Sequence, residues 1–172
     1  MSMQIDLYKS LFQKHFENPS LKNNIKNAVE LVKDSKRILF IGNGGSNAIC
    51  SHMMEDYMKI ASIPTLSFSD PALITCFAND YGYENALKEW IGFSYQNGDL
   101  LFAISSSGES TNILNGVKKH KELGGKVITL SGFKAENSLS KQGAVNFLVD
   151  EENYGIVECF HQVILHAILD EL

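Results

Sequence analysis

The chain lacks several features that would place it outside the ordinary globular proteins. It has only 3 prolines in 172 residues, and 44% of its residues are hydrophobic against 20% charged, which excludes collagen-like, low-complexity and disordered chains. Basic residues are scarce, since 15 Lys and Arg against 20 Asp and Glu give a net charge of −5. That sign is wrong for a protein whose main role is binding nucleic acid or an anionic membrane, although local donors can still hold a small anion.

Cysteine and long apolar runs are also scarce. Cys50, Cys76 and Cys159 are odd in number and have no C-x-x-C spacing, which predicts neither a disulfide framework nor a zinc ribbon. No stretch reaches about 18 consecutive apolar residues, and residues 1–20 lack the apolar segment of a signal peptide. We therefore expect a soluble, cytoplasmic protein with reduced thiols and no membrane or nucleic-acid partner.

The length of 172 residues suits a single domain, residues 1–172, and the sequence contains no internal repeat or Pro/Gly/Ser-rich linker. Short apolar runs typical of buried strands alternate with amphipathic segments typical of helices. The strand candidates are residues 38–41, 65–68, 99–104, 126–130 and 145–149. The helix candidates are residues 3–17, 20–35, 45–60, 71–78, 83–96, 109–123, 136–142 and 155–172.

This alternation predicts an α/β fold, because parallel strands need crossover connections and these are almost always right-handed. We expect a three-layer, doubly wound, five-stranded parallel sheet in the flavodoxin-like order 2-1-3-4-5. In such sheets ligands bind beyond the carboxyl ends of the strands where the winding reverses, here between the first and third strands. The opening helices, within residues 1–35, have no place in the sheet, so we expect their apolar stripes to pack in a subunit interface.

Two loops follow the first and third strands and should meet at this point. Residues 42–46 read GNGGS and residues 105–110 read SSSGES. Glycines let backbone amides approach a ligand closely, and serine hydroxyls and helix N-termini donate to anions. The first loop lacks the last glycine of the G-x-G-x-x-G dinucleotide pattern, and neither loop has the G-K-[ST] of a P-loop. The pair predicts a phosphate or sugar-phosphate cradle; the alternative is two ordinary turns in which Ser46 and Ser107 are helix N-caps.

Imidazoles and carboxylates gather on two of the predicted helices. His52 and Asp56 are four residues apart and share a helix face. The last helix carries Glu158, His161, Gln162 and His166, of which Gln162 and His166 share a face while His161 points elsewhere. Such groups suit a divalent metal such as zinc, or a proton-transfer pair. The alternative is an exposed ion pair, which is the commoner origin of a His–Asp spacing of four.

Other residues that could suggest chemistry are expected to have structural roles. We expect Cys50 and Cys159 to pack against the sheet as small apolar side chains. The Lys-Lys-His-Lys run at residues 118–121 is predicted to form the solvated face of a helix. Trp90 and Phe93 are expected in the core or a subunit interface, because a stacking platform for single-stranded nucleic acid would need basic residues around them.

Five motifs together carry a family resemblance: the GNGGS loop, His52 six residues after its serine, residues 79–83 (NDYGY), the SSSGES loop and the His-rich last helix. In this order, over nearly the whole chain, they resemble the phosphoheptose isomerases, which are sugar isomerase (SIS) domain proteins. The resemblance implies a homotetramer with zinc that interconverts sedoheptulose 7-phosphate and D-glycero-D-manno-heptose 7-phosphate. It also implies a role in making the heptose of bacterial surface lipopolysaccharide or capsule.

The resemblance also implies roles for individual residues. The substrate-binding set is Asn43, Gly44, Gly45, Ser46, Asn79, Asp80, Ser105, Ser106, Ser107 and Ser110. The metal ligands, holding one Zn²⁺ per subunit, are His52, Asp56, Glu158 and His166. At two positions the sequence departs from the family pattern: Asp56 stands where the family has a glutamate that is both ligand and base, and Glu158 stands where it has a glutamine ligand.

These departures leave the base open. Shortening the side chain at position 56 moves the carboxylate, and a misplacement on the order of 1 Å can cost about a hundredfold in rate, whereas an added carboxylate should hold a dication more firmly. The base is predicted to be Asp56 or Glu158, with Glu55 as a further candidate, and His166 the acid of an enediol mechanism. Two other functions remain: an isomerase of a different phosphosugar, or a non-catalytic SIS protein resembling the replication-initiator-associating regulators.

Overall fold

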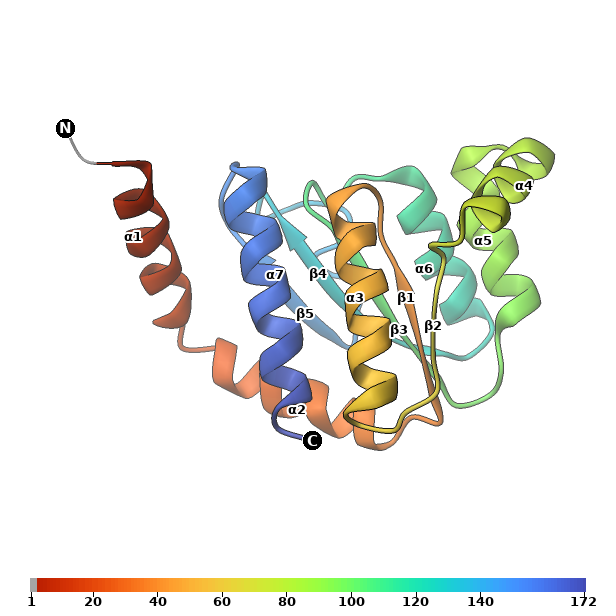
Figure 1. The fold of residues 1–172 in the computed structure, drawn as a ribbon, viewed down its shortest axis with the longest axis horizontal. Coiled ribbons are helices and arrows are strands. Elements are labelled where there is room, and N and C mark those ends of the chain that lie inside the picture. Colours follow the sequence, from red (N-terminus) through yellow and green to blue (C-terminus); the bar gives the residue numbers. More distant parts are fainter. Residues whose placement is uncertain (1–2) are drawn as a thin grey trace.

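A sheet of five parallel strands forms the centre of the molecule, seen in a computed structural model that describes residues 3–172 (Figure 1). The strands are β1 (Arg37–Ile41), β2 (Thr65–Ser67), β3 (Asp99–Ser105), β4 (Lys126–Gly132) and β5 (Val145–Val149). Their order is β2-β1-β3-β4-β5, and each neighbouring pair is parallel. The predicted sheet and its order are therefore confirmed, with the winding reversed between β1 and β3.

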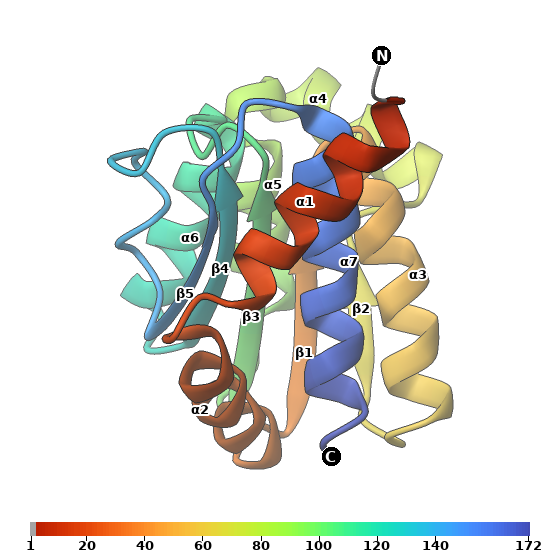
Figure 2. The same cartoon turned by 90° about the vertical axis from the view of Figure 1, so that its left-hand side faces the viewer.

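Helices cover both faces of the sheet. They are α1 (Gln4–Phe16), α2 (Leu21–Lys33), α3 (Gly45–Lys59), α4 (Pro71–Tyr81), α5 (Tyr83–Ser94), α6 (Thr111–Glu122) and α7 (Tyr154–Leu169). Figures 1 and 2 show α3 and α7 side by side on one face, and α5 and α6 on the other. Within residues 3–172, no helix combines the length and the apolar character needed to cross a membrane.

The period of two along each strand divides the core into two layers. In β1, Ile38 and Phe40 pack with α2, α3 and α7, whereas Leu39 and Ile41 pack with α5 and α6. All four side chains are buried because both faces of the sheet are covered. This explains why the strands read as unbroken apolar runs.

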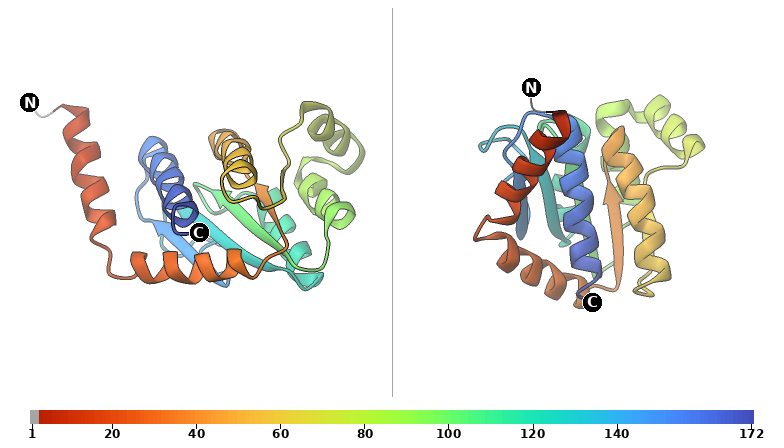
Figure 3. Two further views of the ribbon diagram at one scale, coloured as in Figure 1. Left: turned by 60° about the horizontal axis from the view of Figure 1, so that its bottom comes forward. Right: turned by 60° about the vertical axis from the view of Figure 1, so that its left-hand side comes forward.

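The first helix stands out from the body of the molecule (Figures 1 and 3). Its attachment to α7 is aromatic, with the rings of Phe12 and Phe160 5.4 Å apart and nearly perpendicular. Met3, Ile5 and Leu7 nevertheless remain exposed, by 71%, 65% and 43%. The chain by itself therefore leaves part of the apolar surface of α1 uncovered.

One predicted helix is wrong. Residues 136–142 form turns without a helix. Asn137 is buried there, and its Nδ2 donates to the carbonyls of Gly132 and Lys134 while its Oδ1 accepts the Ser140 N–H. Asparagine side chains compete in this way with the hydrogen bonds of a helix, and periodicity alone does not detect that competition.

Candidate active site

The loops after β1 and β3 meet around one hollow of about 230 Å³. Each loop leads into a helix, α3 or α6, so the free backbone amides of two helix N-termini lie beside it. The hollow is lined by Asn43, Gly44, Gly45, Ser46, Ile104, Ser105, Ser106, Ser107, Ser110, Tyr154 and Glu158. Eight of the ten residues predicted to bind substrate are in this set, so the expected meeting of the two loops is confirmed.

The loop after β3 is held in shape by its own hydroxyl groups. Ser105 Oγ donates to Ser110 Oγ at 3.1 Å and accepts the Gly108 N–H at 3.2 Å. Gly108 has a φ of +68°, and a Cβ there would overlap the side chain of Asn137, so this turn requires glycine. The buried Ser106 hydroxyl has no hydrogen-bond partner within residues 3–172. It is therefore available to a ligand in the hollow.

The segment that follows β4 is hydrogen bonded to the loop of residues 105–110. The Glu109 carboxylate accepts the Ser138 N–H at 2.8 Å and the Ser138 hydroxyl at 2.7 Å. These two hydrogen bonds lower the pKa of Glu109. The Leu139 N–H donates to the Gly108 carbonyl at 3.0 Å. The exposed Glu109 is thus engaged with Ser138 and is not one of the residues that line the hollow.

A glycine at the start of α3 makes room for a carboxylate from α7. A Cβ on Gly45 would lie 2.5 Å from both Oε atoms of Glu158, so Glu158 rests against the N-terminus of α3. The free N–H groups and the dipole of that end of a helix favour negative charge. The N-terminus of α3 would also favour the phosphate of a ligand. Because the Glu158 carboxylate lies there, one side of the otherwise donor-rich hollow carries negative charge.

Asn43 is hydrogen bonded to Tyr83, from the NDYGY motif, and to Asn112, which the sequence alone did not single out. Its Oδ1 accepts from Asn112 Nδ2 at 2.8 Å and from the Tyr83 hydroxyl at 2.9 Å, and its Nδ2 donates to Asn112 Oδ1 at 2.9 Å. Asn112 is buried at the start of α6, directly after the serine loop. The Asn43 amide therefore has one N–H left for a ligand. The only sequence signal for Asn112 was its place at the start of α6, directly after the serine loop.

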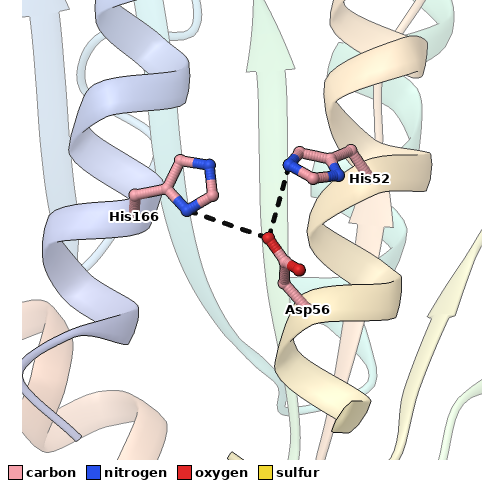
Figure 4. Close-up of side chains that lie close together, drawn as sticks. All are labelled: His52, Asp56 and His166. Carbon is pink, nitrogen blue, oxygen red and sulfur yellow. Dashed lines mark ion pairs between the residues drawn. The ribbon is translucent and has the colours of Figure 1, made fainter. Parts of the chain in front are cut away.

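The imidazoles of α3 and α7 converge on one carboxylate (Figure 4). Asp56 Oδ2 lies 3.3 Å from His52 Nε2 and 3.8 Å from His166 Nδ1. All three ligand atoms lie within 4.8 Å of one another. Asp56 is mostly buried, whereas His52 and His166 are half exposed and face it from two helices 114 positions apart in sequence.

The donor set of this His52–Asp56–His166 group fits a zinc ion. Two imidazole nitrogens and one carboxylate oxygen are a ligand set of catalytic zinc sites, in which a fourth position stays open for water or substrate. Glu158 does not belong to this group and lies in the hollow instead. The same two helices also reach the hollow, α3 through Gly45 and Ser46 and α7 through Tyr154 and Glu158, and they lie side by side.

Three other predicted candidates belong neither to the lining of the hollow nor to the His52–Asp56–His166 group. Asn79 and Asp80 are exposed on α4, where Asn79 Nδ2 donates to Asp80 Oδ1 at 2.8 Å, and neither residue lines the hollow. Glu55 is exposed and pairs with Lys59 at 3.6 Å. Glu55 is therefore turned toward Lys59 and is not part of the His52–Asp56–His166 group.

The remaining histidines are buried. His161 is fully buried on α7, where its Nε2 lies 3.1 Å from the Ser131 carbonyl oxygen, and burial lowers its pKa to about 4. It points away from the His52–Asp56–His166 group, as predicted. His120 is also fully buried, and burial lowers its pKa. The prediction that residues 118–121 form a purely solvated face is therefore wrong at His120, whose ring packs against Tyr95.

Three smaller expectations also have clear outcomes. Cys50 is buried, and burial raises the pKa of its thiol, but Cys159 is exposed, so the expected packing of Cys159 is wrong. Trp90 is in the core, whereas Phe93 is 73% exposed. The N-caps of α3 and α6 are Gly44 and Ser110. The alternative that Ser46 and Ser107 serve as N-caps is therefore wrong.

Comparison with known proteins agrees with this architecture. The SIS domain family model matches residues 6–132. The phosphoheptose isomerase of Cytophaga hutchinsonii is 33% identical over 138 residues, which cover 75% of this chain and 72% of the relative. The phosphoheptose isomerase of Fusobacterium nucleatum is 28% identical over 172 residues, which cover 97% of this chain and 88% of the relative. The solved structure of phosphoheptose isomerase GmhA from Neisseria gonorrhoeae has the same fold, with a TM-score of 0.86 over 97% of this chain and 94% of that one at 24% identity. The chain belongs to the phosphoheptose isomerase family of SIS domain proteins.

Proposed function

We propose that the protein is an aldose–ketose isomerase that converts sedoheptulose 7-phosphate to D-glycero-D-manno-heptose 7-phosphate in the cytoplasm. The observation that carries the proposal is the hollow between the two loops, which contains hydrogen-bond donors for an anion and also a carboxylate. The two helices that bring Gly45 and Glu158 to it, α3 and α7, also bear the titratable His52–Asp56–His166 group. The relatives of this chain are phosphoheptose isomerases, which supports a phosphorylated heptose as the substrate.

The phosphate is proposed to bind the serine loop and the N-terminus of α6. Of the residues lining the hollow, none is Lys or Arg, so hydroxyl and backbone N–H groups must hold the anion. The unpartnered Ser106 hydroxyl and the single free N–H of Asn43 are donors placed for this role. Helix N-termini bind phosphate by the same physics in other proteins.

The reacting end of the sugar is proposed to extend toward the His52–Asp56–His166 group. Along α3, Ser46 and His52 are six positions apart, which corresponds to about 9 Å of helix. An extended seven-carbon phosphate has a comparable reach. The carbons next to the carbonyl would then lie near the carboxylates and imidazoles, and the phosphate would remain at the loops.

Proton transfer between the neighbouring carbons requires one base and one acid. We assign the base to Glu158, because its carboxylate lines the hollow, and the acid to His166, two turns further along α7. The base takes a proton from the carbon next to the carbonyl while the acid protonates the carbonyl oxygen, which gives an enediol. The base then returns its proton to the former carbonyl carbon, while the hydroxyl on the other carbon gives its proton back to the acid and becomes the new carbonyl. Asp56 is the competing base, since it faces both imidazoles.

A metal ion would complete this chemistry. His52, Asp56 and His166 would hold Zn²⁺, which when bound polarises sugar oxygens as a Lewis acid. In this assignment Asp56 holds the metal and Glu158 moves the proton. The resemblance to the family instead makes Glu158 a fourth metal ligand. A substitution of Glu158 should lower the zinc content of the protein if Glu158 is a ligand, and should leave it unchanged if Glu158 is only the base.

The function is tested by measuring bound metal in the purified protein and following its reaction with sedoheptulose 7-phosphate by NMR. The proposal expects stoichiometric zinc and turnover in the wild type, loss of turnover with retained zinc in Glu158→Gln, and loss of both in Asp56→Asn. Retained turnover in His166→Ala would refute the mechanism. Wild-type protein without zinc or turnover would favour the non-catalytic regulator, and turnover of a different phosphosugar alone would replace the substrate.

Assembly is the remaining part of the proposal. We propose that residues 1–172 form one domain and that the helices of residues 1–35 join copies into a homotetramer. The exposed apolar residues of α1 need a partner surface. Size-exclusion chromatography with light scattering should give four times the mass of 19.1 kDa; a monomer would refute this.

A further inference from the structure

Gln162 lies on α7 between Glu158 and His166, one turn from each, and none of the roles assigned above uses it. Its Nε2 lies 3.0 Å from His166 Nε2 and also faces the Met53 sulfur. Within the described residues, Gln162 is the one side chain hydrogen bonded to the His166 ring. The other ring nitrogen, Nδ1, is the one that faces Asp56 Oδ2 at 3.8 Å.

The two ring nitrogens of His166 therefore have separate neighbours. A neutral imidazole carries one N–H and one lone pair, and a ligating imidazole must direct its lone pair at the metal. If Nδ1 is the ligand, the hydrogen is on Nε2 and needs an acceptor. In metalloproteins a carboxylate, carbonyl or water usually provides that acceptor and thereby holds the ring in the ligating orientation.

We propose that Gln162 is a positioning residue that holds His166 as a metal ligand through Nδ1. In the structure the amide presents Nε2, a donor, to His166 and to Met53, whose sulfur can only accept. Rotating the amide by half a turn about its last bond presents Oε1 to His166 Nε2–H. A glutamine can satisfy either tautomer of His166; the metal-bound tautomer requires the turned amide, which gives up the contact of Nε2 with the Met53 sulfur.

The inference rests on the proposed function, because it requires a metal at the His52–Asp56–His166 group. It also revises that function at one point: with both ring nitrogens engaged, His166 holds the metal and is not free to act as the acid. It goes further in assigning one of the two His166 nitrogens as the ligand and in adding a residue that the family resemblance did not supply. It also separates two substitutions that a merely space-filling role would not separate. Leucine at position 162 removes the acceptor, whereas glutamate keeps it and loses only the donor.

The test is the affinity of the metal-stripped full-length protein for Zn²⁺, measured by competition with a chromophoric chelator. We expect Gln162→Leu to bind Zn²⁺ about 10- to 100-fold more weakly than the wild type. Gln162→Glu should bind at least as tightly as the wild type. Cys159→Ser, on the exposed side of the same helix, is the matched control and should leave the affinity unchanged. The visible absorption of bound Co²⁺ should be altered in Gln162→Leu and restored in Gln162→Glu.

The outcomes separate this inference from the function on which it rests. Equal affinities of the wild type and Gln162→Leu would overturn the role of Gln162 and leave the metal site intact. An equal loss in Gln162→Leu and Gln162→Glu would overturn it as well, because the acceptor would then be irrelevant. A wild type that binds no Zn²⁺ would overturn the metal site and this inference together. Circular dichroism of each variant confirms that it is folded.

Discussion

Gly45→Ala should lower catalysis without lowering stability. Gly45 is the first residue of α3, and its backbone is not among the positive-φ residues, so alanine is compatible with the local conformation. Replacing glycine by alanine in a helix is favourable by about 0.5–1 kcal/mol in general. The added Cβ, however, would stand 2.5 Å from the Glu158 carboxylate, where ordinary contact begins at 3.4 Å.

The expected magnitude follows from this distance. Glu158 is the flexible partner, so its carboxylate should retreat by about 1 Å, and a displacement of that size at a reacting group can cost about a hundredfold in rate. The assay is kcat and KM for sedoheptulose 7-phosphate, with the free energy of unfolding from urea titration of the same sample. We expect kcat to fall by about a hundredfold while the free energy of unfolding stays equal or rises.

Two further variants make the reasoning refutable. Gly44→Ala adds a Cβ with no atom within 4 Å but at a φ of +54°, so it should lower the free energy of unfolding by about 1–3 kcal/mol. In a Glu158→Gln background, Gly45→Ala should cause little further loss of kcat, because the displaced carboxylate is already absent. Wild-type kcat in Gly45→Ala, or additive losses in the double variant, would show that Glu158 does not act from this position.

Three other predictions concern groups outside the proposed metal site. Asn112→Ala should raise KM several-fold with a smaller change in kcat, because Asn43 loses both of the hydrogen bonds that join the two side chains; steady-state kinetics decides, and an unchanged KM contradicts it. Burial lowers the pKa of His161 to about 4 in the folded protein, whereas the unfolded chain binds this proton near pH 6.5. The free energy of unfolding should therefore decrease by up to about 3 kcal/mol as the pH falls from about 6.5 to about 4. His161→Gln should reduce that loss in urea titrations at pH 7 and pH 5, and an identical slope would refute it. Gly108→Ala should lower the free energy of unfolding by more than about 1 kcal/mol, from its positive φ and the overlap with Asn137; an unchanged melting temperature would contradict this.

The sequence by itself determined the architecture and the position of the hollow. Strand and helix periods are local properties of neighbouring residues, so apolar runs and amphipathic segments indicated the five strands, seven of the eight predicted helices and, with the crossover rule, the sheet order. The same rule placed residues 42–46 and 105–110 at the carboxyl ends of β1 and β3, where they meet. Residue spacing predicted the kinds of site, a sugar-phosphate cradle and a metal or proton-transfer group, and the resemblance to a family added the individual ligands and the sugar substrate.

Only the tertiary structure decided which side chains touch. His52 and His166 converge because α3 and α7 pack side by side, although 114 positions separate the residues, and no local pattern encodes the rotation of one helix against another. The same packing places Glu158 against Gly45 rather than in the His52–Asp56–His166 group, and Gln162 between Met53 and His166. In residues 136–142, the buried Asn137 replaced a helix with side-chain hydrogen bonds. The free energy of such long-range contacts depends on burial and distance, which a linear pattern of residue types does not contain.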